Sequence, residues 1–418
     1  MDSNQEVISM AKKYKIYIID DDPVSLKLME TFLKQKGYDV ITNLSSVEGY
    51  NDIIKCRPDA VIIDIMMPVL DGLEVCKRLR AIEELKDSKI IVVSAKSYDY
   101  DIKRAFSLGA DSYIVKPIVP QDFVKKVEET ISPKIILTFW GVRGTLPVTG
   151  KKSLKYGGNT SCLSVLFPKD RLFIFDAGTG IKELSNYLLS IKKLKFKANI
   201  LLSHPHWDHI QGLPFFVPLY MQGNEFAICG ASHGNINMRA VISEQMEGIY
   251  FPITIREFGS RTYFKDLTED SYDMDGISVK TKLLTHPGYD LGYRIDYEGK
   301  SICYITDNEL YPPDSKFYSQ TYRDQLTDFI RDSDILIHEC TYFDDEYLKK
   351  VNWGHSSVSQ VADLAHNANV RNLYIFHHDP DQTDSDVERK LEIINKILVE
   401  KNSSTKCFPA IEQEEIIL

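Results

Sequence analysis

Short apolar runs alternate with amphipathic stretches over residues 15–131. Apolar runs of this length between turn residues are typical of buried strands, and the stretches between them repeat apolar residues at the helical period. Regular alternation of strand and helix predicts a doubly wound α/β domain, a parallel sheet with helices on both faces. The predicted elements are strands at 16–19, 39–42, 60–63, 90–94 and 112–115, and helices near 23–36, 46–55, 72–81, 100–108 and 120–130.

Polar residues mark the ends of these predicted strands. Asp20 and Asp21 follow the first strand, Asp64 follows the third, Ser94 ends the fourth and Lys116 follows the fifth. Functional groups of doubly wound sheets gather at the carboxyl ends of the strands. Carboxylates gathered there repel one another unless a cation lies among them, and Mg²⁺ prefers such oxygen ligands. The lysine could neutralise an added phosphoryl group, and the serine hydroxyl could donate a hydrogen bond to it.

The D-D, D-x-x-M-P, S-A and K-P segments occur together and in this order, and the region resembles a response-regulator receiver domain. The resemblance implies that Asp64 accepts a phosphoryl group from a cognate histidine kinase. It also implies Mg²⁺ ligands and switch residues: Asp20, Asp21, Asp64 and the Met66 carbonyl for Mg²⁺, and Ser94, Tyr113 and Lys116 for the switch. The alternative for Tyr113 is an ordinary core tyrosine.

The last predicted helix of this region stops at Ile131, Ser132 and Pro133, because proline cannot continue a helix and restricts the residue before it. A chain of 418 residues is also long for one hydrophobic core. We therefore expect a (βα)5 domain at 14–131 and a second domain at 132–418.

The second domain contains one dense cluster of ligand-type side chains. A predicted buried strand at 198–202 is followed by His204, His206, Asp208 and His209, in the spacing HxHxDH. A turn there can direct the first two histidines to one metal ion and the other two residues to a second. Imidazole and carboxylate ligands suit zinc, manganese or iron and not calcium. The alternative is a polar loop without a metal.

Three more candidate ligands, His286, Asp307 and His377, each follow a predicted strand. Together with the HxHxDH cluster they resemble the metallo-β-lactamase superfamily, which implies an αββα sandwich. The resemblance implies two metal sites with a bridge: His204, His206 and His286 on one ion, Asp208, His209 and His377 on the other, and Asp307 between them. His378 is the alternative to His377. Asp176 is expected to orient one of the histidines without binding metal itself.

Residues 336–341 and 354–357 resemble two motifs of the ribonuclease Z-like phosphodiesterase branch. The resemblance implies that His355 stabilises the phosphate and helps to protonate the leaving group. It also implies that Glu339 orients His355 and that Asp208 acts in catalysis. The serines after His355 could instead only cap a helix. Arg143 and Asn159 lie in glycine-rich segments and are candidate substrate-binding residues, with a surface turn as the alternative for Arg143.

We therefore expect a two-component response regulator whose output is a dinuclear metal phosphodiesterase, with zinc as the favoured metal, manganese or iron as alternatives, and Mg²⁺ in the receiver. The net charge of −10 disfavours a large polyanionic partner such as nucleic acid. A small phosphodiester is the favoured substrate, such as a cyclic nucleotide or cyclic dinucleotide. Alternatives are a ribonuclease Z-like RNA-processing nuclease, a thioester or lactone hydrolase, and a metal-containing module that only binds a ligand.

Scattered cysteines without a CxxC pair and the lack of a long apolar run predict a cytoplasmic protein with no membrane contact. A homodimer is among the expected assemblies.

Overall fold

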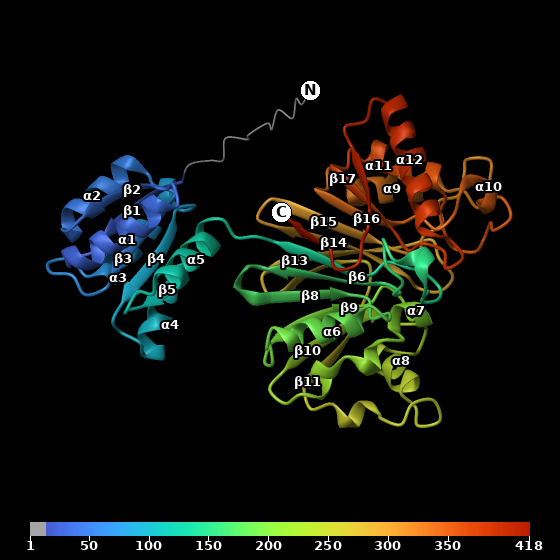
Figure 1. Ribbon diagram of the computed structural model, residues 1–418, viewed down its shortest axis with the longest axis horizontal. Coiled ribbons are helices and arrows are strands. Elements are labelled where there is room, and N and C mark those ends of the chain that lie inside the picture. Colours follow the sequence, from blue (N-terminus) through green and yellow to red (C-terminus); the bar gives the residue numbers. More distant parts are fainter. Residues whose placement is uncertain (1–13) are drawn as a thin grey trace. The chain divides into compact units, whose positions relative to one another are not determined.

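The computed structural model (Figure 1) describes residues 14–418, which divide between Lys134 and Ile135 into two compact units. No helix among these residues is both long enough and apolar enough to cross a bilayer.

The first unit is a five-stranded parallel sheet in the order β2-β1-β3-β4-β5. Strands and helices alternate along the chain: β1 Lys15–Ile19, α1 Pro23–Gln35, β2 Asp39–Asn43, α2 Ser46–Cys56, β3 Ala60–Asp64, α3 Gly72–Arg80, β4 Lys89–Ser94, α4 Asp99–Ser107, β5 Ser112–Val115 and α5 Pro120–Ile131, with a 3-10 turn at Glu83–Leu85. Buried residues of α1 and α5 pack on one face of the sheet, and those of α2, α3 and α4 pack on the other. The predicted (βα)5 architecture is confirmed.

The second unit contains two seven-stranded mixed sheets. The first sheet has the order β11-β10-β9-β8-β7-β6-β19: β6 Ile136–Gly141, β7 Cys162–Phe167, β8 Arg171–Phe175, β9 Lys197–Leu201, β10 Glu225–Ala231, β11 Arg261–Leu267 and β19 Glu415–Ile417. The second sheet has the order β12-β13-β14-β15-β16-β17-β18: β12 Ser271–Met274, β13 Ile277–Leu283, β14 Leu291–Tyr297, β15 Lys300–Ile305, β16 Ile335–Glu339, β17 Asn372–Phe376 and β18 Lys406–Pro409.

Helices cover the outer faces of both sheets. The α-helices are α6 Ile181–Ser190, α7 Trp207–Ile210, α8 Met238–Gln245, α9 Gln320–Ile330, α10 Asp344–Tyr347, α11 Val358–Asn367 and α12 Asp384–Glu400. The 3-10 turns are Lys151–Ser153, Pro168–Asp170, Leu213–Phe215, Val217–Tyr220 and Ile255–Glu257. Residues of α6 and α8 pack on the first sheet, and residues of α9, α11 and α12 pack on the second.

An apolar core fills the space between the two sheets. Phe175 of the first sheet meets two tyrosines of the second, with its ring centroid 5.8 Å from that of Tyr293 and 5.5 Å from that of Tyr304. All three side chains are almost fully buried, and burial of one large apolar side chain stabilises a fold by roughly 1.5–3 kcal/mol. Because the sheets face each other and helices flank them, the predicted αββα sandwich is confirmed.

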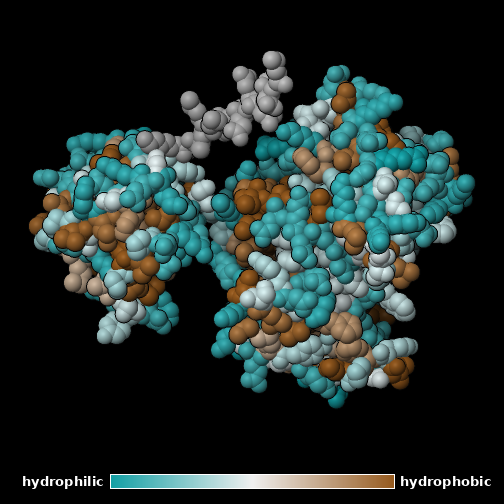
Figure 2. All heavy atoms as spheres, viewed as in Figure 1, coloured by the Kyte–Doolittle hydropathy of each residue, from teal (hydrophilic) through white to brown (hydrophobic). Residues whose placement is uncertain are grey.

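The outer surface is of a different character. Figure 2 shows that hydrophilic residues dominate the visible face of each unit, with hydrophobic residues in separate patches. Binding and catalytic residues lie most often on loops that a rigid scaffold positions, such as those at the ends of the strands.

Candidate metal centre and acidic pocket

A single turn after a central strand supplies four of the predicted metal ligands. Strand β9 ends at Leu201, His204 lies in the loop that follows, and His206 is the N-cap of the short helix α7. Asp208 and His209 lie in this helix and are buried, whereas His206 is exposed at the opening. An extended loop is followed directly by a helical turn, so the four side chains all lie at the carboxyl end of β9.

The second sheet supplies the other three predicted ligands. His286 follows β13, Asp307 follows β15 and His377 follows β17. Strands β15, β16 and β17 are parallel neighbours, so their carboxyl ends lie at one edge of the sheet. His377 leaves its strand with a positive φ of 54°, a conformation that is uncommon for residues other than glycine.

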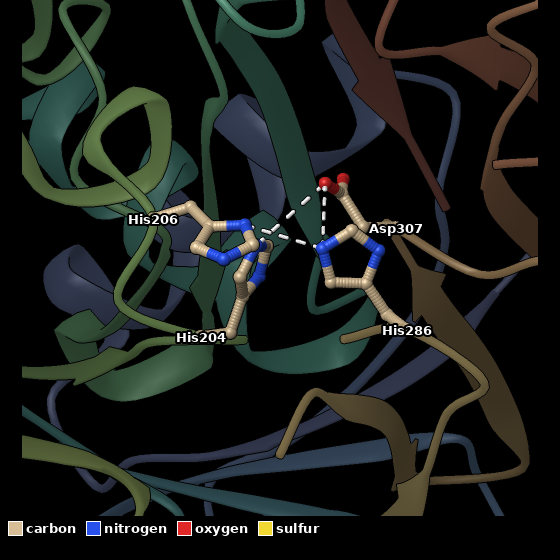
Figure 3. Close-up of side chains that lie close together, drawn as sticks. All are labelled: His204, His206, His286 and Asp307. Carbon is tan, nitrogen blue, oxygen red and sulfur yellow. Dashed lines mark hydrogen bonds and ion pairs between the residues drawn. The ribbon is translucent and has the colours of Figure 1, made fainter. Parts of the chain in front are cut away.

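Asp307 lies between two groups of histidines. Its Oδ2 is 3.6 Å from His204 Nε2 and 3.7 Å from His286 Nε2. Its Oδ1 is 3.4 Å from His209 Nε2 and 3.1 Å from His377 Nε2. Figure 3 shows the first group, in which the rings of His204 and His286 face the carboxylate and His206 lies beside His286. Each carboxylate oxygen thus faces a different set of nitrogen donors.

The donor atoms within each group lie within 4.8 Å of one another. The groups coincide with the two expected ligand sets: His204, His206, His286 and Asp307 form one, and Asp208, His209 and His377 form the other. A third group joins His355 to Asp307 and His377.

The buried donors fit divalent cations. The Nε2 atoms of His204 and His209 are buried and have no hydrogen-bond partner within residues 14–418. Buried polar atoms are normally paired, and an unpaired one is costly. Nitrogen and carboxylate donors without a nearby thiolate suit zinc, manganese or iron. These residues therefore have the chemistry to hold two such ions.

Neighbouring groups fix the orientation of the histidine rings. His209 Nδ1 lies 2.8 Å from Asp176 Oδ2, and His286 Nδ1 lies 2.9 Å from the Gly354 carbonyl oxygen. An Nδ1–H that donates outward leaves the Nε2 lone pair directed at the centre. The hydroxyls of Ser203 and Tyr304 also donate to Asp176 Oδ2, at 2.9 Å and 2.6 Å. Asp176 therefore lies where the sequence led us to expect an orienting carboxylate.

The charges of the cluster favour the ligand forms of these residues. Burial opposes ionisation of Asp307, but His377 and His209 outweigh it and hold the pKa of this carboxyl well below its usual range. Asp208 behaves in the same way beside His209 and His377. Burial also holds the pKa of His204 well below that of a free imidazole. Ionised carboxylates and a neutral imidazole are the forms that bind metal.

His355 lies at the edge of this centre. Its Nδ1 is 4.0 Å from Asp307 Oδ2 and has no hydrogen-bond partner among the described residues. Its ring is stacked on that of His377, with centroids 5.2 Å apart. Burial lowers the pKa of His355 to about 3, so the free protein carries it as a neutral imidazole at pH 7.

Glu339 contacts the segment that carries His355 through the backbone, and its expected role in orienting His355 stays a prediction. Its Oε2 accepts hydrogen bonds from the backbone N–H and the hydroxyl of Thr341, and its Oε1 accepts one from the Ser356 N–H. Thr341 Oγ1 in turn lies 3.3 Å from His377 Nδ1. Burial raises the pKa of Glu339 to about 8. This carboxyl therefore positions the loops beside His355 and the His377 ring.

The side chains of Arg143 and Asn159 both make hydrogen bonds within the protein. Arg143 is fully buried, and its Nε and Nη1 donate to the carbonyl oxygens of Gly157 and Gln382, at 2.9 Å and 2.7 Å. Asn159 Nδ2 donates to Glu412 Oε2 at 3.1 Å. Full burial directs Arg143 into the protein interior, whereas Asn159 is half-buried and its role in substrate binding stays a prediction.

Asp290 is a buried carboxylate that the sequence analysis missed. Its Oδ2 lies 3.5 Å from His204 Nδ1, and neither of its oxygens has a hydrogen-bond partner within the described chain. Burial and the neighbouring Asp307 raise its pKa well above the usual range. Asp290 stands just before β14, whereas the search by pattern examined the ends of strands.

The first unit has an acidic pocket at the carboxyl ends of its strands. Lys116 Nζ lies 2.8 Å from Asp20 Oδ2 and 2.9 Å from Asp64 Oδ1. Asp64 Oδ2 accepts a hydrogen bond from the Met66 N–H at 2.6 Å, and Asp21 is exposed beside this pocket. Burial raises the pKa of Asp20, and the two carboxylates outweigh burial to raise the pKa of Lys116.

Ser94 and Tyr113 meet the loop after β4. The buried Ser94 Oγ accepts a hydrogen bond from the Lys96 N–H at 3.3 Å, and the Tyr113 hydroxyl donates to the Lys96 carbonyl oxygen at 2.8 Å. The half-buried tyrosine therefore has a polar partner in a loop and is not enclosed in the apolar core.

Comparison with known proteins divides the chain in the same way. A family model described as a response regulator receiver domain matches residues 16–128, and one described as a beta-lactamase superfamily domain matches residues 171–378. The chain is 35% identical over 114 residues to the alkaline phosphatase synthesis transcriptional regulatory protein PhoP of Bacillus subtilis (strain 168), which covers 27% of this chain and 47% of that protein.

The nisin biosynthesis regulatory protein NisR of Lactococcus lactis subsp. lactis is 42% identical over 119 residues, 28% of this chain and 50% of its own. The chain thus spans about half the length of these curated relatives. Among solved structures, the metallo-beta-lactamase fold protein YhfI from Bacillus subtilis superposes with a TM-score of 0.50 at 16% identity, over 68% of this chain and 100% of YhfI. That likeness is one of fold.

Proposed function

Because this chain joins a response regulator receiver domain to a beta-lactamase superfamily domain, we propose that it is a metal-dependent phosphodiesterase controlled by phosphorylation of Asp64. The observation that carries the proposal is the position of Asp307, whose two oxygens face different groups of histidines. A carboxylate in that position can bridge two cations, and paired cations are typical of enzymes that hydrolyse phosphate esters.

When bound, two divalent cations neutralise a phosphodiester and lower the pKa of a nearby water. The ligand set for them is proposed to be His204, His206, His286, Asp208, His209, His377 and the bridging Asp307.

The protein's own groups position the reactants. Asp208 accepts a hydrogen bond from the Thr145 N–H at 2.7 Å, which fixes the carboxylate, and its Oδ2 also lies 3.1 Å from His377 Nε2. From this position the carboxylate can orient an attacking water as well as bind metal.

His355 is proposed to contact the phosphate. Its unpaired Nδ1 lies beside Asp307, and the adjacent Ser356 N–H is held by Glu339. An imidazole N–H at this distance from the centre can donate a hydrogen bond to a phosphoryl oxygen. In the negative field of a bound phosphate it can also carry a proton to the departing oxygen.

A small phosphodiester is the proposed substrate. The chain has a net charge of −10, and proteins that bind long nucleic acids usually carry a basic face to attract the phosphate backbone. Cyclic mononucleotides and cyclic dinucleotides need only local contacts. We also propose a cytoplasmic location, since the seven cysteines are all free thiols, as expected in a reducing compartment.

Control by phosphorylation is proposed from the acidic pocket. A phosphoryl group on Asp64 adds negative charge and three acceptor oxygens where Lys116 now pairs with both Asp20 and Asp64. Lys116, which pairs with Asp64, and the hydroxyl of Ser94 at the end of the neighbouring strand β4 are the groups proposed to bind it. A histidine kinase is the proposed donor, and Mg²⁺ held by Asp20, Asp21 and the Met66 carbonyl is the proposed cofactor.

The test is hydrolysis of a panel of substrates by the metal-loaded protein: bis(p-nitrophenyl) phosphate, cyclic mononucleotides, cyclic dinucleotides, precursor tRNA and a thioester. We expect turnover of the small phosphodiesters, and loss of that turnover in Asp307→Asn. Turnover of the thioester alone would reject the phosphodiesterase proposal, and cleavage of precursor tRNA alone would reject the small substrate.

A further inference from the structure

A cavity of about 180 Å³ lies between the segment after Asp307 and the start of helix α9. Four of its nine lining residues are aromatic, Tyr311, Phe317, Tyr318 and Tyr322, and two are charged, Glu309 and Arg323. Sites that enclose a whole drug-sized ligand measure roughly 300–1,000 Å³. This cavity therefore suits one planar ring system and not a complete dinucleotide.

The wall of the cavity is bonded to the backbone that carries two candidate metal ligands. The Tyr322 hydroxyl donates to Asn308 Oδ1 at 2.6 Å and accepts a hydrogen bond from the Thr285 N–H at 3.1 Å. Asn308 follows Asp307 in sequence, and Thr285 precedes His286. The cavity wall thus contacts the residues that neighbour His286 and Asp307 in sequence.

A second connection runs to the segment that carries His355. Glu309 lines the cavity, and its oxygens accept hydrogen bonds from the backbone N–H groups of Asn352 and Gly354, both at 2.8 Å. Gly354 immediately precedes His355. The cavity therefore lies beside the segments that bear the proposed metal ligands and the proposed phosphate contact.

The chemistry of the walls favours a neutral heteroaromatic ring. Phe317 and Tyr311 form an aromatic pair with centroids 5.3 Å apart, and such rings stack with any nucleobase. Within the described chain the Arg323 guanidinium has no carboxylate at ion-pair distance, and its one hydrogen bond runs from Nη2 to the Gln360 carbonyl oxygen at 3.3 Å. Its other N–H groups are free for the carbonyl oxygens and ring nitrogens of a base.

A second phosphate fits these walls less well than a base, because the Glu309 carboxylate would repel it. We therefore propose that this cavity is a subsite for the base of a nucleotide substrate, so that the enzyme prefers nucleotide esters to simple ones. This inference rests on the proposed phosphodiesterase function.

Two substrates with the same leaving group isolate the contribution of the base. Thymidine 5′-(p-nitrophenyl phosphate) carries a nucleoside where methyl p-nitrophenyl phosphate carries a methyl group. The ratio of their kcat/KM values therefore reports contacts to the nucleoside. Base stacking on one aromatic side chain corresponds to about a tenfold effect, so Phe317→Ala and Tyr318→Ala should each lower this ratio about tenfold through KM.

Matched variants distinguish the effect of removing an aromatic ring from the effect of unfolding the protein. Phe317 is 45% exposed, so its truncation should leave the fold intact. Tyr318→Phe keeps the ring and should keep the ratio, and Tyr263→Ala removes a comparably exposed aromatic residue on β11 and should not change it. Arg323→Gln should lower the ratio while leaving hydrolysis of the methyl ester unchanged.

Calorimetric titration of metal-loaded protein with thymidine 5′-monophosphate measures the subsite without turnover. We expect binding to wild type and at least tenfold weaker binding to Phe317→Ala/Tyr318→Ala. Equal affinity for the two proteins, or an unchanged ratio of kcat/KM in all three subsite variants, would overturn the inference. If wild type hydrolyses neither ester but the double variant loses nucleotide binding, the phosphodiesterase proposal fails and the base site stands.

Discussion

A methyl group added at Gly144 should disable the metal centre without altering any metal-binding side chain. A Cβ atom at this position would lie 2.1 Å from Cε1 and 2.3 Å from Nδ1 of His377. To restore ordinary contact at 3.4 Å, the ring would have to retreat by roughly 1.3 Å. His377 Nε2 would lie only 2.6 Å from the same Cβ, and it is also 3.1 Å from both Asp208 Oδ2 and Asp307 Oδ1. The ring can therefore relieve the clash only by leaving its place in the cluster.

The size of the effect follows from this displacement. Overpacking of a well-packed interior costs about 1–3 kcal/mol of stability, which a unit of this size should survive. A misplacement of about 1 Å at a catalytic centre can lower the rate by about 100-fold. For Gly144→Ala we therefore expect a folded protein with about 100-fold lower kcat/KM on bis(p-nitrophenyl) phosphate.

Elemental analysis should find that Gly144→Ala retains about one ion per chain where wild type binds two. Gly248→Ala is the matched control, because no atom lies within 4 Å of the added Cβ, and it should behave like wild type. A folded Gly144→Ala protein with wild-type metal content and activity would refute the assigned position of His377 in the centre.

Three further predictions concern single side chains. Asp176→Asn should weaken metal binding about 10- to 100-fold, because His209 Nδ1 loses its carboxylate acceptor; competition with a chromogenic chelator measures this, and unchanged affinity would contradict the orienting role. Asp64→Asn should abolish labelling by acetyl phosphate and make turnover or oligomeric state insensitive to acetyl phosphate. Parallel assays of wild type and mutant with and without acetyl phosphate measure this, and persistent labelling would exclude Asp64 as the acceptor. His355→Ala should lower kcat on phosphodiesters about 10²- to 10⁴-fold at unchanged metal content, and full activity would remove His355 from the reaction.

The fold of the first unit could be predicted largely from the sequence because its central strands, such as β3 and β4, are buried on both faces. In the first unit each predicted strand agrees with an observed one to within one residue at either end, since continuous apolar runs such as those at 60–63 and 90–94 leave little ambiguity. The order of strands within the two large sheets could not be predicted this way. It depends on pairings between distant segments, such as β19 with β6.

Candidate ligands were found by the rule that functional groups follow strands. This rule works for Asp307 and His377 because parallel neighbours end at one edge of the sheet. It works for His286 because β13 and β15 are both antiparallel to β14 and therefore run in the same direction. It fails for Asp290, which precedes its strand. The rule also does not predict which way a loop side chain points. For this reason Arg143 was predicted to bind substrate, although its side chain faces the protein interior.

The cavity beside the centre had no sequence signal at all. Phe317 and Tyr318 come from a loop, and Tyr322 and Arg323 come from the first turn of α9. Aromatic residues at such positions are as often core residues as ligand contacts, and only the folded chain brings them around one space.

The proposed ligands come from both halves of the sandwich: His204 and His209 follow a strand of the first sheet, and His286, Asp307 and His377 follow strands of the second. Bound ions would therefore cross-link the two sheets at the ends of the strands that carry the ligands. Above the dissociation constant, each tenfold rise in free metal adds about 1.4 kcal/mol per site to the stability of the native state. Metal supply would then govern how long this unit survives unfolding and proteolysis as well as how fast it works.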